Sequence, residues 1–531
     1  MNHLYLGDCL NVLRENIKDE SVDLVYIDPP FNSKRDYNIF FDDKEIQTQR
    51  IAFEDTWTLT NIQDSLTELH TLEHEDLWAL LIVYQKVAPH AFPYLVMMSL
   101  RLLELHRVLK PTGSFYLHCD PTMSHYLKTI CDLVFGPKNY ANEIIWQRIN
   151  AKGNVQRKFG AVHDIIFRYT KNLGEDIWNQ VYRPLNPEYV ENNYRHIEEE
   201  TGRRYTQSDL TAPIQRASKG QIYVWKGISP PDTRCWVYAK EKMEELEAQN
   251  RIIYTKNGMP RLKRFLDNNE GEKIPDVWTD LTQVLGGEYL GYPTQKPKAL
   301  LERIIQASSN EGDVVLDAFC GCGTTVDAAE SLHRNWIGID ISPIAISLIK
   351  RRLNDTYEGH VNKFEIRGTP KDKESAIELW KQNPNAFQDW WLTEFEVFST
   401  TFGTKGADKG IDGIGQYLID HKGNETIRAA FQVKGGTHIQ SKDIDALIGA
   451  MDKHKCQLGV FLTIEDPTKP MLDTVAGSGF VQVPGFQYPR LQILTLKDYF
   501  KNKRPKLPSV NITFKAATKK GKQSHQEELD L

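Results

Sequence analysis

The first third of the chain alternates between two hydrophobic patterns. Short unbroken apolar runs, such as VDLVYI (22–27) and SFYLHC (114–119), predict strands that are buried on both faces. Longer segments with apolar residues three or four positions apart, such as 93–110 and 125–136, predict helices between these strands. Strands that alternate with helices favour a parallel sheet covered on both faces.

The alternation stops in a polar middle region and then returns. The segment 298–309 predicts a helix, and DVVLDAF (313–319) and NWIGID (335–340) predict strands. A separate C-terminal domain begins with an expected helix over WWLTEFEVFSTTFG (390–403), and AAFQVK (429–434) predicts one of its strands. With 531 residues the chain is too long for one ordinary core, so we expect at least two domains of the α/β class.

The changes in composition place the expected domain boundaries. A first domain spans 1–355 and includes a polar, Arg- and Tyr-rich insert at 151–285. A polar linker is expected at 356–389 and a smaller α/β domain at 390–500. The last segment, 501–531, is basic and then acidic with few large apolar residues, which predicts a largely disordered tail.

Charge and cysteine content exclude several classes of protein. The net charge is −6, so a nucleic-acid partner would be held by local basic patches and not by the overall field. Seven cysteines without a CxxC pair argue against a disulfide framework and against a zinc ribbon. No apolar stretch approaches the roughly 20 residues that span a bilayer, and the N-terminus lacks the layout of a signal peptide, so we expect no membrane and a cytoplasmic protein.

A strand, a glycine loop, a helix and a second strand follow one another in DVVLDAFCGCGTTVDAAESLHRNWIGIDIS. Gly321 and Gly323 allow a tight turn and close approach to a ligand, and Asp340 at the end of the second strand can accept two ribose hydroxyls. A dinucleotide site would have a third glycine where Val326 stands. An adenosyl compound without phosphates therefore fits better than a dinucleotide, although an ordinary strand-to-helix turn would also use these glycines.

The strand at 22–27 ends on Asp28, Pro29, Pro30 and Phe31. The amino group of a nucleobase is a poor nucleophile, and two acceptors, a carboxylate and a fixed backbone carbonyl, can direct its lone pair towards a methyl group. Prolines fix the backbone and donate no N–H. Phe31 offers a face on which a base that has left the duplex can stack. A simple strand-ending turn is the alternative explanation of the four residues.

Taken together, these motifs identify a family. DPPF, YPTQKP, FCGCG and GIDIS, in this order after LYLGDCLNVL, resemble the DNA amino-methyltransferases that make N-6 methyladenine or N-4 methylcytosine, in their beta arrangement. The resemblance covers roughly residues 1–355. It implies a Rossmann-like methyltransferase sheet, S-adenosylmethionine as cofactor, double-stranded DNA as partner, and target recognition by residues 151–285. A homodimer or a restriction-system partner is compatible with this arrangement.

The resemblance also implies roles for individual residues. Asp28, Pro29, Pro30 and Phe31 would form the acceptor pocket. Asp in place of the Ser that is commoner in cytosine enzymes favours adenine, and N-4 cytosine methylation remains the alternative. The cofactor contacts would come from Asp317, Phe319, Gly321, Gly323 and Asp340, with Thr294, Gln295, Lys296 and Pro297 closing the methionine side.

The expected C-terminal domain, 390–500, contains GIDG followed by a Q-x-K strand. Asp412, with Glu396 as a second candidate, offers oxygen ligands for Mg²⁺. Lys434, two places after Gln432, could offset charge on an attacked phosphate. This pattern resembles the Mrr-like branch of the PD-(D/E)xK nucleases. The chain is therefore expected to be a methyltransferase fused to a restriction-endonuclease-like domain. A C-terminal domain that only binds DNA or a partner, and a dinucleotide-dependent oxidoreductase, are the alternatives.

Overall fold

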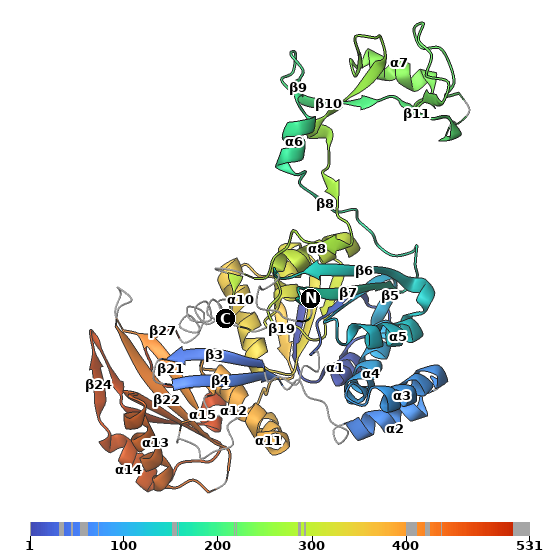
Figure 1. Ribbon diagram of the computed structural model, residues 1–531. Coiled ribbons are helices and arrows are strands. Elements are labelled where there is room, and N and C mark those ends of the chain that lie inside the picture. Colours follow the sequence, from blue (N-terminus) through green and yellow to red (C-terminus); the bar gives the residue numbers. More distant parts are fainter. Residues whose placement is uncertain are drawn as a thin grey trace. The chain divides into compact units, whose positions relative to one another are not determined.

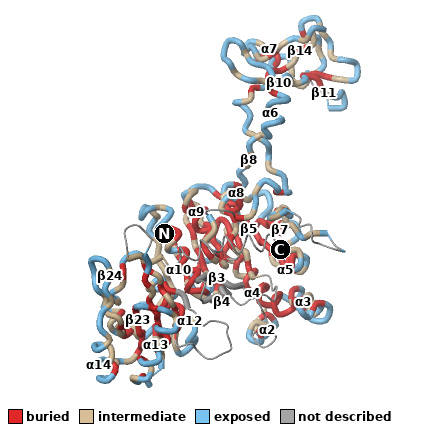
Figure 2. The backbone as a smooth tube through the Cα atoms, turned by 60° about the vertical axis from the view of Figure 1, so that its left-hand side comes forward, coloured by how far each residue is buried: buried red, intermediate tan, exposed pale blue. Residues whose placement is uncertain are grey.

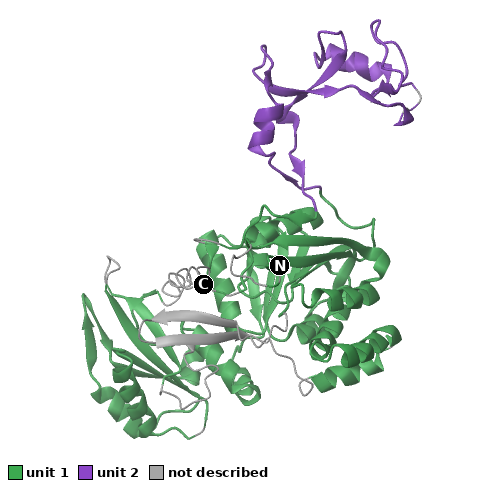
Figure 3. Cartoon of the chain, in the orientation of Figure 1, with its two compact units in different colours: residues 1–179, 276–531 green, residues 180–275 purple. Residues whose placement is uncertain are grey.

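The structure is a computed structural model that divides the chain into two compact units. Met1–Asn179 and Asp276–Leu531 form one unit, and Gln180–Pro275 form the other (Figure 3). The residues described are 2–30, 37–43, 46–53, 62–72, 74–150, 157, 159–216, 218, 220–284, 288–290, 292, 294–399, 411–419, 425–436 and 438–512. Phe31, expected in the acceptor pocket, lies outside them.

A nine-stranded sheet forms the centre of the first unit in the described part of the chain (Figure 1). In spatial order its strands are β16 (Val277–Trp278), β6 (Tyr140–Gln147), β7 (His163–Thr170), β5 (Leu109–Cys119), β2 (Val22–Ile27), β17 (Val314–Asp317), β18 (Asn335–Asp340), β1 (Asn2–Leu6) and β19 (Phe364–Arg367). A separate antiparallel pair is formed by β3 (Tyr37–Asp43) and β4 (Ile46–Phe53).

The expectation of a parallel sheet needs one correction. Strand β7 runs antiparallel to both of its neighbours, β5 and β6, whereas the other pairings in this sheet are parallel. Gln147 at the end of β6 pairs with His163 at the start of β7, so the two residues lie at the same end of the sheet and β7 runs back beside β6. A parallel neighbour would need a crossover to the other end of the sheet.

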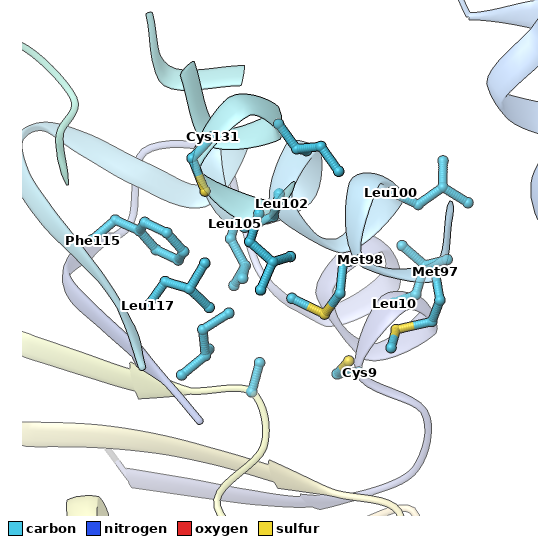
Figure 4. Packing of buried hydrophobic residues seen from close by; sticks show 14 of the residues in the cluster. Cys9, Leu10, Met97, Met98, Leu100, Leu102, Leu105, Phe115, Leu117 and Cys131 are labelled. Atoms are coloured by element: carbon cyan, nitrogen blue, oxygen red, sulfur yellow. The ribbon is translucent and has the colours of Figure 1, made fainter. Parts of the chain in front are cut away.

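Helices cover both faces of this sheet, as expected. On β5, Phe115 and Leu117 join the core cluster that includes helices α1, α4 and α5, as the close-up in Figure 4 shows. The residue between them, Tyr116, donates or accepts a hydrogen bond of 2.8 Å with Ser308 of α8 on the other face. The helices of this domain are α1 (Cys9–Asn16), α2 (Gln63–Thr71), α3 (Glu75–Val87), α4 (Phe92–Val108), α5 (Ser124–Phe135), α8 (Lys298–Ser308), α9 (Thr324–Ser331) and α10 (Pro343–Tyr357).

Burial is concentrated in the sheet and in α4, in which every residue from Phe92 to Leu102 is buried (Figure 2). A helix segment that is apolar on nearly all sides belongs in the interior of a domain. The second half of α4 also carries partly exposed charges, Glu104 and Arg107, which pair with each other. None of the helices in the described residues is both long and apolar enough to cross a membrane.

The second unit, 180–275, lies within the insert expected at 151–285. A four-stranded antiparallel sheet has the order β13-β14-β10-β9, and a small apolar core that includes Trp236 and Met243 packs beside it. The elements are β8 (Tyr182–Arg183), α6 (Pro187–Asn193), β9 (His196–Ile197), β10 (Arg204–Asp209), β11 (Thr211–Pro213), β12 (Arg234–Trp236), α7 (Lys240–Ala248), β13 (Ile252–Tyr254), β14 (Pro260–Phe265) and β15 (Glu272–Lys273).

A second sheet in the first unit begins after residue 397 and has the order β20-β21-β22-β23-β26. Strand β22 is antiparallel to β21 and parallel to β23. The elements of this C-terminal domain are β20 (Phe398–Ser399), β21 (Gly413–Leu418), β22 (Thr426–Lys434), α13 (Ser441–Lys453), β23 (Leu458–Thr463), α14 (Lys469–Gly477), β24 (Phe480–Val483), β25 (Phe486–Pro489), β26 (Leu491–Thr495), α15 (Leu496–Phe500) and β27 (Val510–Asn511).

The segment expected to be a linker, 356–389, is structured. Strand β19 closes the edge of the large sheet beside β1, and two helices follow, α11 (Lys373–Gln382) and α12 (Pro384–Thr393). Two capping residues explain the helices: Asp372 caps the first, and Asn383 accepts the Ala386 N–H at the start of the second. Part of the expected tail is structured as well, because β27 pairs with β21.

The helix expected over 390–403 is wrong in its extent. Helix α12 ends at Thr393, and Glu396 has a left-handed backbone with φ of +54°. The spacing of aromatic residues misled the prediction, because a turn and not a helix packs the half-buried Phe395 against the core. Its ring stacks on Phe431 at 5.9 Å and meets Tyr499 edge to face.

Candidate active site

Three acidic residues lie at the carboxyl ends of neighbouring parallel strands. Asp28 follows β2 directly, Asp317 ends β17, and Asp340 ends β18. Strand β17 pairs with β2 on one side and β18 on the other, so the two halves of the predicted site meet although nearly 300 residues separate them. Ligands of open α/β sheets bind at this edge.

Asp340 holds the glycine loop that follows β17. Its carboxylate accepts the N–H groups of Gly321 and Ser342, each at 2.8 Å. Gly321 has φ of +49°, and a Cβ there would lie 3.2 Å from the ring of Tyr292; Gly323 has φ of +77°, and a Cβ there would lie 2.6 Å from Ile349. Both glycines are therefore required by the backbone and by their neighbours. Burial raises the pKa of Asp340 to about 6.

Asp317 is engaged within the same loop. It accepts the Thr325 hydroxyl at 2.5 Å and the Phe319 N–H at 3.0 Å, so both carboxylate oxygens have partners in the protein. Burial raises the pKa of Asp317 to about 7, and the charges of Asp28 and Asp340 add to this. The geometry makes Asp317 a residue that shapes the loop, and Phe319 beside it is half-buried.

The Asp28 carboxylate has one occupied oxygen and one unoccupied oxygen. Oδ2 forms an ion pair with the ammonium of Lys296, and both side chains are largely buried. Oδ1 is buried and has no hydrogen-bond partner among the described residues. Pro29 is buried beside it. A buried carboxylate oxygen without a partner is costly, and a donor from a ligand would remove that cost.

In the loop before α8, Gln295 stabilises the loop itself, whereas Lys296 contacts Asp28. Lys296, expected on the methionine side of a cofactor, places its ammonium on Asp28 and near the carbonyl of Thr294 at 3.4 Å. Gln295 is buried and braces the loop: its amide donates to the Glu288 carbonyl at 2.7 Å and accepts the Leu290 N–H at 2.8 Å. Pro297 caps α8.

Two features of this edge were not predicted. Ile341, directly after Asp340, has a side chain that is 64% exposed although it follows a buried strand. A buried chain of hydrogen bonds runs from Tyr26 through His118 to Asp164 beside the Asp28 turn. Only the histidine within the apolar run FYLHC could have indicated it, since a polar residue in a buried strand needs a partner.

In the C-terminal domain, Asp412 directly precedes β21, and Gln432 and Lys434 lie on the neighbouring strand β22. The Asp412 N–H donates to the Phe431 carbonyl at 2.8 Å, and its Oδ2 accepts the Val433 N–H at 2.6 Å. Gln432 is buried, and its Oε1 has no partner within the described residues. Lys434 ends β22 and is half-buried. The structure thus brings three of the four expected nuclease residues together.

Glu396 does not join them. The pairing of Phe398 with Ile414 in β20 and β21 carries the preceding residues away from Asp412. The Glu396 carbonyl accepts from Asn511, which pairs with Tyr417, five positions from Asp412 and thus about 16 Å along the strand. Among the described residues, no group of three or more His, Cys, Asp or Glu side chains is placed to hold a metal ion.

The sheet of the second unit carries aromatic and basic residues together. The rings of His196 and Tyr205 stack at 5.3 Å, and Phe265 meets Tyr205 edge to face. The Arg203 guanidinium lies 3.9 Å from the centre of the Phe265 ring, and Lys263 forms a 2.8 Å ion pair with Glu198. Part of the positive charge expected here is therefore neutralised within the unit.

Comparison with known proteins agrees with both halves of the prediction. Residues 22–351 match the family model described as DNA methylase, and residues 391–483 match the model described as restriction endonuclease. The Type II methyltransferase M.EcaI of Enterobacter cloacae is 31% identical over 336 residues, which are 62% of this chain and 72% of that enzyme.

Two further proteins show the range of the similarity. The Mod subunit of the Type III restriction-modification enzyme StyLTI of Salmonella typhimurium is 27% identical over 62% of this chain, a match that spans half of that subunit. The structure of the PvuII DNA methyltransferase (cytosine-N4-specific) has 15% identity and a TM-score of 0.33, and the match covers 66% of this chain and 86% of that one. The chain belongs to the DNA methylase family and carries a C-terminal domain of the restriction endonuclease family.

Proposed function

We propose that this protein transfers a methyl group from S-adenosylmethionine to the N-6 amino group of adenine in double-stranded DNA, as part of a restriction–modification system. The observation that carries the proposal is the buried Oδ1 of Asp28, which has no hydrogen-bond partner in the described part of the chain, at the edge of the sheet that holds Asp340. The relatives named above, a Type II methyltransferase and a Type III Mod subunit, support the restriction–modification setting.

The residues around Asp340 fit S-adenosylmethionine. The carboxylate lies at the end of β18 where ribose hydroxyls can donate to it, and Gly321 leaves the loop backbone free of a side chain. The exposed Ile341 offers an apolar surface on which the adenine of the cofactor can lie. When bound, this cofactor supplies an electrophilic methyl group on a positively charged sulfur.

The Asp28 turn fits an amino group as acceptor. Oδ1 accepts one N–H of the amine, and a backbone carbonyl of the Pro29–Pro30 turn accepts the other, because proline nitrogens offer it no competing donor. These two acceptors draw the nitrogen lone pair out of conjugation with the base. Lys296 compensates the charge of the Asp28 carboxylate on its far oxygen, so Oδ1 keeps its direction towards the acceptor.

The test is methylome sequencing of a host that expresses the chain, together with analysis of DNA incubated with the purified protein and labelled S-adenosylmethionine. N-6 methyladenine in a defined sequence context is the expected result. N-4 methylcytosine would replace the proposed base and keep the reaction class. Absence of label in DNA would overturn the proposed function.

We propose further that the C-terminal domain cleaves DNA with Mg²⁺. Gln432 Oε1, a buried amide oxygen that has no partner among the residues the structure describes, lies on the strand whose backbone binds Asp412. Hard oxygen ligands of this kind suit Mg²⁺, and Lys434 would stabilise charge on the phosphate. Glu396 is not included in this site. Cleavage assays with methylated and unmethylated DNA test the proposal, and a domain that only binds DNA is the outcome if neither is cut.

The second unit is proposed to recognise the target sequence. Its stacked rings, His196 and Tyr205, and the nearby Arg203 are the residue types that hold phosphates and stack on bases. Exchange of residues 180–275 with the corresponding region of a relative of different specificity should change the methylated sequence and leave the modified base the same.

A further inference from the structure

A chain of buried polar side chains crosses the large sheet beside the Asp28 turn. The hydroxyl of Tyr26 in β2 lies 2.9 Å from Nδ1 of His118 in β5, and Nε2 of His118 lies 3.2 Å from Oδ2 of Asp164 in β7. The three residues are 2%, 0% and 4% exposed. Arg148, just after β6, completes the chain with an ion pair of 3.2 Å to Oδ1 of Asp164.

Such a chain needs an explanation. Burial of three polar groups gives less stability than apolar residues of the same shape would, even when every hydrogen bond is made. The chain begins two residues before Asp28, and the alternation along β2 puts Tyr26 and Asp28 on the same face. These hydrogen bonds therefore hold the end of β2, the strand that Asp28 follows directly.

The chemistry of the two ends gives the chain a direction. Burial, together with the charges of Asp28, Asp317 and Asp164, raises the pKa of Tyr26 well above its ordinary value, so its phenol stays protonated and can donate to Nδ1 of His118. The imidazole then carries its proton on Nε2 and donates it to Asp164. Trp146 packs edge to face on the same imidazole at 5.6 Å and limits its rotation.

Asp164 also interacts electrostatically with Lys296, the residue that pairs with Asp28. Burial by itself raises the pKa of Asp164, but the hydrogen bond from His118 and the charges of Lys296 and Arg148 bring it below its ordinary value. Lys296 forms an ion pair with Asp28 and also favours the charged form of Asp164. The hydrogen bonds through His118 and Tyr26 are the contacts that connect Asp164 to the strand that ends at Asp28.

We propose that His118 and Asp164 are positioning residues for methyl transfer, which hold the Asp28 carboxylate in the orientation that the acceptor amine requires. The proposal rests on the proposed methyl-transfer function. Misplacement of a reacting group by about 1 Å can cost 10²-fold in rate. Loss of these hydrogen bonds should therefore lower kcat for methyl transfer. The cofactor site at Asp340 should be unchanged, because β18 lies two strands from β2 in the sheet.

The test compares four single variants of the full chain. Tyr26→Phe removes one hydrogen bond, Asp164→Asn removes the charge, and His118→Phe keeps a ring but removes both hydrogen bonds. His118→Gln retains a donor near the Nε2 position and should recover part of the rate. We expect kcat to fall by roughly 10- to 100-fold in the first three, with S-adenosylmethionine affinity by calorimetry and KM for DNA within about threefold of the wild type.

A matched control and a double variant exclude a merely structural role. Tyr116→Phe removes another buried tyrosine hydroxyl from the same sheet face, the one bonded to Ser308. It should lower the melting temperature about as much as Tyr26→Phe but leave kcat unchanged. Tyr26→Phe combined with His118→Phe should be no slower than His118→Phe alone, because the chain is already broken.

The outcomes separate this inference from the function on which it rests. A wild-type chain that does not methylate DNA would overturn both. An active wild type with normal kcat in Tyr26→Phe and Asp164→Asn would overturn the positioning role alone. A kcat that falls equally in Tyr26→Phe and Tyr116→Phe would also overturn it, because kcat would then depend on the stability of the protein and not on the hydrogen bonds from Tyr26 to Asp164.

Discussion

Both candidate centres of this chain place polar side chains at the ends of neighbouring strands, but the contacts that hold these side chains differ in number. At the edge of the large sheet, Asp28, Asp317 and Asp340 end three neighbouring strands, and each is held by named contacts. In the C-terminal domain, Asp412 and Gln432 meet across one strand pair, and Glu396 lies elsewhere. In the first centre the described contacts fix all three carboxylates, whereas the second offers few oxygen ligands among the described residues.

The largest effect is expected at Asp28. Asp28→Ala should abolish detectable methyl transfer, a fall of roughly 10³-fold, because the amine loses its acceptor. Cofactor affinity, measured by calorimetry, should stay within a few-fold. Asp23→Asn, at the other end of β2, is the matched control and should retain activity. An equal loss of cofactor binding in Asp28→Ala would move Asp28 to the cofactor site.

The C-terminal centre should respond independently. Asp412→Ala or Lys434→Ala should remove Mg²⁺-dependent cleavage and leave methylation and the melting temperature near those of the wild type. An ordinary surface ion pair would contribute at most about 1 kcal/mol and no activity. If both variants cut DNA as the wild type does, these residues do not form the nuclease site.

Asp340→Ala is expected to weaken S-adenosylmethionine binding by about 30- to 150-fold, since a charged acceptor of two ribose hydroxyls contributes roughly 2–3 kcal/mol. The same variant also loses the contact that holds Gly321. Calorimetry at fixed pH measures the effect. A variant that binds the cofactor normally would show that the ribose is held by another residue.

The raised pKa of Asp340 gives a smaller effect with a defined direction. With a pKa of about 6, the carboxylate is mostly protonated at pH 5 and mostly ionised at pH 7, so cofactor affinity should rise about tenfold between them. Stability changes in the opposite sense: this group favours folding below its ordinary value of 3.8 and loses that contribution as the pH rises through 6. In Asp340→Asn both dependences should flatten; a tenfold rise that persists there would assign it to another group.

The smallest effect is expected for Glu396→Gln. Because Glu396 lies beside Asn511 and Tyr417, away from Asp412, cleavage should remain within about twofold of the wild type under the same assay. A loss as complete as that in Asp412→Ala would place Glu396 in the metal site and make the two centres more alike than the structure shows.

The sequence predicts the strand ends well and the contacts between strands poorly. Asp28 and Asp340 could be placed because apolar runs define where each strand stops. The antiparallel β7 could not be placed, and the contact between His118 and Asp164 was therefore missed. The hydrophobic pattern of one strand shows which face is buried but not which strand it pairs with. The helix expected around Glu396 ends earlier, at Thr393, because aromatic residues spaced by three and four are compatible with a turn as well as with a helix.

The pairing of β1 has a consequence for how the chain is made. This N-terminal strand takes its two neighbours, β18 and β19, from more than 330 residues further along the sequence. At translation rates of roughly 5–20 residues per second, the edge of β1 waits about 15–70 s for its partners to be synthesised. Such long-range pairing is slow and exposes an unpaired edge to aggregation, so the ribosome-bound chain is expected to need chaperones until residue 367 has emerged.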